Sequence, residues 1–135
     1  RYFMKICGIE LKANNAIFVL IDDRKFIDLK TKKLTIENDE TQEDIRKFCN
    51  EFLLFLEENQ VEKVVIKKRA KKGTFAGGAV TFKLEALIQL NPICEVELIS
   101  SQTIASFEKK NIIEFPKEFK KYQEQAFLSA LSYIG

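Results

Sequence analysis

Histidine and tryptophan are absent from the 135-residue sequence, and cysteine occurs only three times. Without histidine, Ser-His-Asp or Cys-His nucleophilic catalysis and the usual zinc and haem sites are poor fits. Cys7, Cys49 and Cys94 are odd in number, far apart and not in a Cys-X-X-Cys pair. We therefore expect reduced thiols, which pack as small hydrophobic side chains, in a cytoplasmic protein.

Proline and glycine are also scarce, with two and five residues, so no linker or low-complexity segment divides the chain. The longest apolar runs are strand-sized, and no signal or lipidation motif occurs, so no membrane partner is expected. The length and a hydrophobic content of 46% are typical of a single globular domain. Met4 is the expected natural start, so the domain is predicted to cover residues 4–135, with residues 1–3 a remnant outside it.

Charge is distributed unevenly along the chain, although the formal net charge is only +2. Seven basic residues and no acidic one lie between Lys63 and Lys83. The remainder carries fifteen basic and twenty acidic residues, a net charge of −5. This uneven distribution of charge indicates an anionic partner for the basic segment, whereas the net charge of +2 alone indicates no partner.

The first third of the sequence predicts three consecutive strands. Lys5–Leu11 and Ala16–Ile21 are rich in β-branched residues, and Lys12–Asn15 is a predicted tight turn because Asn tolerates positive φ. A third strand is expected between Phe26 and Ile36, with its register left open. Short turns between successive strands predict an antiparallel meander.

From residue 42 onward the hydrophobic period becomes helical and then alternates with strands. Helices are expected over 42–59, 81–90, 102–107 and 117–134, and strands over 61–67 and 95–100. Thr41 and Ser101 are the expected N-caps of the first and third helices. The last helix should bury Phe119, Tyr122, Ala126, Ala130 and Ile134. The order β-β-β-α-β-α-β-α predicts an α/β fold with a mixed five-stranded sheet and helices on its faces, for which the ribonuclease H-like arrangement is best known.

Several stretches resemble one family over nearly the whole chain from Met4. They are KICGIEL at the start, KKRAKKGTFAGGAVTFKLEALIQL from Lys67, VELISSQTIAS from Val96 and KKYQEQAFLSAL from Lys120. These stretches resemble an uncharacterised bacterial family, domain of unknown function 3010. The resemblance implies a ribonuclease H-like domain and brings no established activity.

A more distant resemblance is to the Holliday-junction resolvase and its relatives. In those enzymes carboxylates from the first strand, a later strand and the final helix hold two divalent metals. The metals activate water for phosphodiester cleavage. By this resemblance Glu10 would take the first position and Glu124 a position on the last helix. The fourth strand ends in Lys67-Lys68-Arg69, where an acid would be needed. Glu10 and Glu124 are thus weak catalytic candidates, no metal site is predicted, and magnesium enters only if a degenerate nuclease activity exists.

A basic segment followed by two glycines is the strongest candidate for a binding site. Gly77 and Gly78 directly precede a predicted helix. Glycine lets the backbone approach an anion closely, and the free N–H groups at the start of a helix can bind it. The segment is not a P-loop, because G-x-x-x-x-G-K-[ST] is absent. A solvated loop and a protein contact are the alternatives. The predicted phosphate-binding residues are Lys67, Lys68, Arg69, Lys71, Lys72, Gly77 and Gly78.

Other residues allow a structural and a functional interpretation. Phe75 and Phe82 could stack on bases but are more often core residues. The polar loop Ser100–Thr103 could contact a ligand, although helix capping explains it as well. Glu10 could bind a metal, be a partner for the lysines, or lie on the more exposed face of its strand. Tyr122–Glu124 could border the crevice at the carboxyl ends of the strands.

Three functions are compatible with this pattern. We favour a non-catalytic ribonuclease H-like domain that binds nucleic acid, a nucleotide or another phosphate-bearing ligand and needs no cofactor. A degenerate metal-dependent nuclease or phosphodiesterase is the second. A protein-interaction module is the third, including a homodimer formed through an edge strand or the last helix.

Overall fold

The computed structural model describes residues 4–73 and 77–135. Strands β1 (Lys5–Lys12) and β2 (Asn15–Asp22) pair antiparallel, as predicted. The turn between them is also where we predicted it, but Ala13 rather than an asparagine takes the left-handed conformation, with φ of 54°. The Asn14 amide instead donates to the Ile36 carbonyl at 2.9 Å, so Asn14 serves to hold a neighbouring segment.

The predicted third strand is two short strands, β3 (Lys25–Ile27) and β4 (Lys33–Thr35). Both pair with β2, at opposite ends of it. The segment between them leaves the sheet, and Leu29 is buried in the core with 2% of its surface exposed. The register explains the break: from the pair Leu20–Ile27 to the pair Ile17–Lys33, this chain advances six residues while β2 advances three, so the extra residues cannot continue the ladder.

The strands form one mixed sheet in the order β3-β2-β1-β5-β6, with β4 paired to β2 off this path. Strand β5 (Lys63–Lys67) is parallel to β1, and β6 (Glu95–Ile99) is parallel to β5. The carboxyl ends of β1, β5 and β6 therefore lie at one edge of the sheet, called the carboxyl edge below. The predicted mixed α/β sheet is confirmed.

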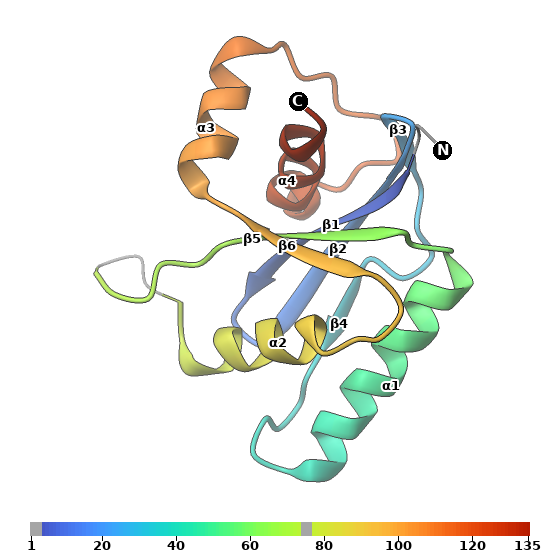
Figure 1. Ribbon diagram of the computed structural model, residues 1–135, viewed down its shortest axis with the longest axis vertical. Coiled ribbons are helices and arrows are strands. Elements are labelled where there is room, and N and C mark those ends of the chain that lie inside the picture. Colours follow the sequence, from blue (N-terminus) through green and yellow to red (C-terminus); the bar gives the residue numbers. More distant parts are fainter. Residues whose placement is uncertain (1–3, 74–76) are drawn as a thin grey trace.

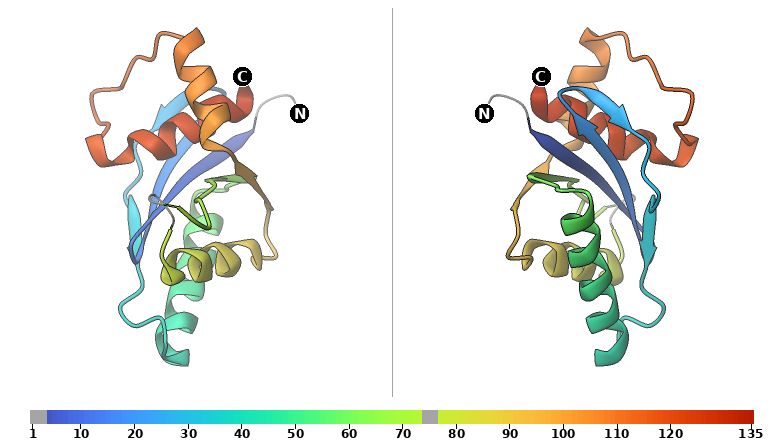
Figure 2. Two further views of the ribbon diagram at one scale, coloured as in Figure 1. Left: turned by 90° about the vertical axis from the view of Figure 1, so that its left-hand side faces the viewer. Right: turned by 90° about the vertical axis from the view of Figure 1, so that its right-hand side faces the viewer.

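Helices cover both faces of the sheet (Figures 1 and 2). Helices α1 (Gln42–Glu58) and α2 (Ala79–Gln89) pack on one face, over a cluster that contains Phe18, Phe52 and Phe55. Helices α3 (Ser101–Lys110) and α4 (Glu124–Ile134) pack on the other, and the 3-10 turn η1 (Lys121–Gln123) leads into α4. No helix within the described residues is both long and apolar enough to cross a membrane.

Helix α4 crosses β1 at Gly8, where the backbones approach closely. A Cβ atom on Gly8 would overlap the Ala126 carbonyl oxygen and lie 3.0 Å from Ala130 Cβ. The absence of a side chain on Gly8 and the small side chains of the two alanines permit this approach. Ala126 and Ala130 are buried, as predicted.

Three details of the helix predictions were wrong. The last helix begins at Glu124, not at Lys117, and Tyr122 is 45% exposed rather than buried. Gln123 explains the late start, because its fully buried amide donates to the Phe18 carbonyl at 2.9 Å and holds η1 against β2. The N-cap of α3 is Ser100, one residue before the predicted Ser101, and its hydroxyl accepts from Thr103 N–H at 3.1 Å.

The predicted N-cap of α1 is confirmed. The Thr41 hydroxyl accepts a hydrogen bond from Asp44 N–H at 3.3 Å, and Glu43 and Asp44 occupy the first turn. Negative side chains at this end of a helix are stabilised by its dipole.

Candidate functional site

The basic segment after β5 lies beside the start of α3. Lys68 N–H donates to the Ile99 carbonyl at 2.8 Å, which ties the first residue of the loop to the last residue of β6. Since α3 begins two residues later, at Ser101, its N-terminus faces the same space. In Figure 1 the chain leaves β5 below the start of α3. Parallel pairing of β5 and β6 thus brings two segments thirty residues apart together at the carboxyl edge.

A shallow cavity of about 390 Å³ lies between these two segments. Its lining contains four basic residues and no acidic one. The lining residues are Lys68, Arg69, Ala70, Lys71, Lys72, Ser100, Ser101 and Gln102. Four of the five predicted basic side chains therefore share one cavity with the polar loop that precedes α3.

The electrostatics of this cavity favour an anion. Lys68, Lys71 and Lys72 are exposed, so their ammonium groups can move to meet a ligand. The first turn of α3 contains no acidic residue, so its dipole adds positive potential and its first N–H groups are donors. Charged side chains and a helix N-terminus together are typical of phosphate sites.

The two glycines of the predicted site differ in what their N–H groups can bind. Gly77 N–H donates to the Ala70 carbonyl at 2.8 Å and closes the loop, so that N–H group is not offered to an anion. A Cβ on Gly77 would lie 3.1 Å from Arg69 Cβ and 3.4 Å from Phe82 Cε2, so the missing side chain makes room for these neighbours. Gly78 is the N-cap of α2, and that helix end has no side-chain cap.

Arg69 and Phe82 pack at the base of the loop. The Arg69 Nε atom is buried and has no hydrogen-bond partner among the residues that the structure describes. Phe82 is half-buried beside it, which favours packing over base stacking. Phe75 lies outside the described residues.

Lys67 differs from the other basic residues because it lies on the face covered by α4. Its Nζ donates to the Gln125 side-chain oxygen at 2.8 Å, and the residue is half-buried. Glu10 is its neighbour on β1, since the pair Ile9–Ile66 immediately precedes them in register. Lys67 thus lies at the same edge of the sheet but outside the lining of the basic cavity.

The acidic residues of the carboxyl edge do not fit a two-metal centre. Glu10 and Glu124 are both half-buried at the α4 side of this edge. Across residues 4–73 and 77–135, no three His, Cys, Asp or Glu side chains are grouped so that they could hold a metal ion. Two divalent ions need more carboxylate oxygens than two glutamates supply, and Lys67 adds a positive charge beside Glu10.

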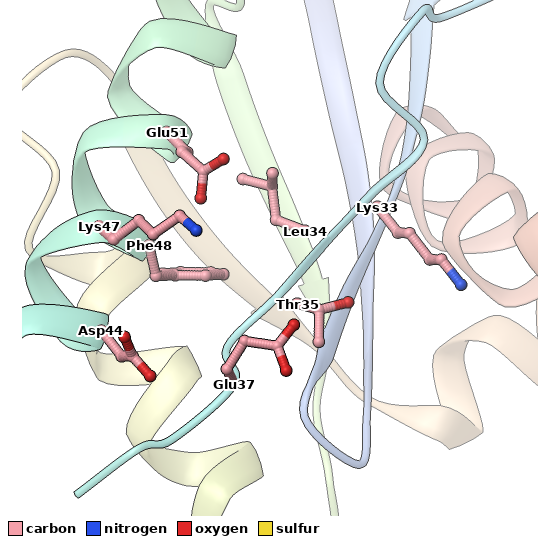
Figure 3. A pocket seen from close by; sticks show the side chains of 8 residues that line it. All are labelled: Lys33, Leu34, Thr35, Glu37, Asp44, Lys47, Phe48 and Glu51. Atoms are coloured by element: carbon pink, nitrogen blue, oxygen red, sulfur yellow. The ribbon is translucent and has the colours of Figure 1, made fainter. Parts of the chain in front are cut away.

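A second cavity, of about 270 Å³, lies between β4 and α1 (Figure 3). Lys47, Asp44 and Glu51 extend from α1 toward the β4 segment, and Glu37, just after β4, also lines the cavity. Charges of both signs give it no preference for an anion. The sequence does not indicate this cavity, because it leaves the register of the third strand open and nothing in it shows that β4 would face α1.

The cysteines are free, as expected. Burial, with a smaller contribution from nearby Cys94, raises the pKa of the Cys7 thiol far above its ordinary range. Burial also raises the pKa values of Cys49 and Cys94. A raised pKa disfavours the thiolate, which is the nucleophilic form, at all three positions.

Comparison with solved structures identifies the fold. RuvC from Thermus thermophilus in complex with Holliday junction substrate is 14% identical in sequence, with a TM-score of 0.67; the match covers 97% of this chain and 92% of that one. A second RuvC structure from the same organism is 12% identical, with the same TM-score and coverage of 97% and 93%. The predicted ribonuclease H-like fold is thus confirmed, and at these identities the likeness shows the fold alone.

Sequence comparison identifies the family. No curated protein matches the chain. Residues 4–133 match the family described as "Protein of unknown function (DUF3010)", as the resemblance of the basic segment and its flanking stretches predicts. The chain belongs to the DUF3010 family, with a RuvC-like ribonuclease H fold.

Proposed function

We propose that the protein binds the phosphate groups of nucleic acid at the carboxyl edge of its sheet. One observation carries the proposal: four basic side chains and the N-terminus of α3 line a single cavity with no carboxylate among them. Each lysine or arginine that neutralises a phosphate releases condensed counterions, which makes binding favourable and dependent on salt.

The residues contribute in different ways. Lys68, Lys71 and Lys72 are exposed and would contact phosphates directly. Arg69 would act from the base of the loop, where its Nε is already buried. Backbone N–H groups at the start of α3 would bind an anionic oxygen, and Gly78, at the uncapped start of α2, would extend the site.

The choice of nucleic acid over a free nucleotide rests on two points. The cavity is shallow and its basic side chains are exposed, which suits an extended backbone better than an enclosed small molecule. A RuvC with the same fold has been solved with a Holliday junction substrate, which is a branched DNA. That fact concerns RuvC, and it guides the choice of probes for this protein.

The test is fluorescence anisotropy with labelled single-stranded, duplex and four-way-junction DNA and with RNA, each with and without magnesium. We expect binding without magnesium that weakens steeply as salt rises from about 50 to about 200 mM. Replacement of Lys68, Arg69 and Lys71 by alanine should weaken binding at least about tenfold and reduce the salt slope by about 2 to 3.

A matched control separates a local site from general charge attraction. Replacement of Arg46, Lys47 and Lys109 by alanine also removes three positive charges, and none of these exposed residues lines the basic cavity. This variant should retain most of the affinity. Equal weakening by both triple variants, or no binding by the unmodified protein at low salt, would contradict the proposal.

A further inference from the structure

Three charged residues lie on the α4 side of the carboxyl edge, namely Glu10, Lys67 and Glu124. Glu10 and Lys67 are neighbours on adjacent strands, one residue beyond the pair Ile9–Ile66. Paired residues of parallel strands point to the same face. Gly8, two residues before Glu10, contacts α4, so Glu10 and Lys67 both face that helix.

Helix α4 runs along β5 in the opposite direction and places Glu124 at the same edge. Gln125, in its first turn, accepts from Lys67 Nζ at 2.8 Å. Tyr133, in its last turn, lies under Lys63, whose Nζ is 5.3 Å from the ring centroid. The first turn of α4, which begins at Glu124, therefore lies at the Lys67 end of β5.

We infer that the Lys67 ammonium group takes the place of a divalent cation as the positive charge on the α4 side of the carboxyl edge, where Glu10 and Glu124 also lie. An ammonium group needs acceptors and tolerates a neutral one such as Gln125, whereas a divalent ion needs several carboxylate oxygens. Glu10, Glu124 and Lys67 thus do not fit the two-metal site implied by the fold, and the local cause is the positive charge of Lys67. The inference does not depend on the proposed nucleic-acid binding, which involves the other side of the loop.

The inference predicts that one substitution opens a metal site. Lys67→Glu removes the ammonium group and adds a third carboxylate beside Glu10 and Glu124. We expect the variant to bind Mn²⁺ at least about tenfold more tightly than the unmodified protein, as measured by calorimetry and by loss of the free-ion electron paramagnetic resonance signal. Millimolar Mn²⁺ should raise its melting temperature by about 5 °C.

Two matched variants separate metal ligation from a change of charge. Lys67→Gln removes the ammonium group without adding a carboxylate and should not gain Mn²⁺ binding. Glu10→Gln, added to Lys67→Glu, should abolish the gain. A folded Lys67→Glu variant that binds Mn²⁺ no better than Lys67→Gln would overturn the inference.

A second measurement applies if Lys67→Glu does not fold. Glu10→Gln and Lys67→Gln are compared singly and together by thermal unfolding, each near-isosteric with the residue it replaces. If the ammonium group acts on Glu10, the melting shift of the double variant should differ by about 2 °C from the sum of the single shifts. Additive shifts would count as a refutation. Anisotropy of the same variants reports nucleic-acid binding separately, so failure of either proposal is recognised on its own.

Discussion

Lys63 and Lys67 stand at the two ends of strand β5 and face the same helix, yet their surroundings differ. Lys63 is 5% exposed, and its Nζ contacts Glu97 at 3.2 Å and Glu95 at 3.4 Å. Lys67 Nζ donates a hydrogen bond to the neutral side-chain amide of Gln125 at 2.8 Å. At the amino end of β5 the charge of Lys63 is matched by two carboxylates. At the carboxyl edge the hydrogen-bond partner of Lys67 is uncharged, so the positive charge of Lys67 can act on other groups.

This contrast separates a lysine that serves the fold from the lysines proposed to bind phosphate, which follow it within nine residues of sequence. Burial opposes the charge of Lys63, but hydrogen bonds with Glu97, Tyr133 and Glu95 outweigh burial and raise the pKa of Lys63 above its ordinary value of 10.5. The charge of Lys63 is thus used inside the fold. Lys68, Lys71 and Lys72, just beyond the other end of the strand, are exposed in the lining of a cavity that contains no acid.

The largest effect is expected from Gly8→Ala, which tests the contact that aligns α4 with both ends of β5. The new methyl group would overlap the Ala126 carbonyl oxygen, so the helix must move away from β1. We expect a loss of about 3 kcal/mol or more in the free energy of unfolding, measured by urea denaturation. A variant as stable as the unmodified protein would show that α4 does not lie this close to β1.

A smaller effect is expected from Lys63→Met, which keeps the aliphatic stem and removes the charge. The free energy of unfolding should fall by about 1 to 2 kcal/mol, because both carboxylate partners are largely exposed and well screened. The folded-state pKa of Lys63 is raised, so its stabilising contribution is present at neutral pH and is lost as the pH rises above 10.5. The unmodified protein should therefore lose its stability advantage over Lys63→Met in urea titrations at alkaline pH.

The smallest effect on stability is expected from the triple alanine variant of Lys68, Arg69 and Lys71. Among the described residues, no carboxylate forms an ion pair with these three side chains, so the free energy of unfolding should change by about 1 kcal/mol or less. The same variant should show the large loss of nucleic-acid binding given above. A large loss of stability without a loss of binding would reverse the contrast between the two ends of β5.

The sequence predicted the architecture well because the strands and helices carry strong, different hydrophobic periods. Lys5–Lys12, Gln42–Glu58 and Lys63–Lys67 lie where the pattern placed them, to within two residues. The start of α4 was missed because the buried hydrogen bond from Gln123 to the Phe18 carbonyl joins residues 105 positions apart. Periodicity reports which side chains are apolar and contains no information on such a contact.

The candidate site was predicted in part. The run of basic residues after a buried strand indicated Lys68, Arg69, Lys71 and Lys72, which line one cavity. The sequence could not separate Lys67 from them, because its orientation toward Gln125 follows from the packing of α4. The use of the Gly77 N–H group inside the loop was equally invisible, since Ala70 is an acceptor only once the loop has closed.

The most direct test of the binding account is a ¹H–¹⁵N correlation titration of the isotope-labelled protein with a short DNA duplex at low salt. The account predicts that the largest shifts occur in the backbone amides of 68–72 and 101–103, with little change at Lys63, Glu95 and Tyr133. Shifts centred on the amino end of β5, or no shifts at all, would contradict it.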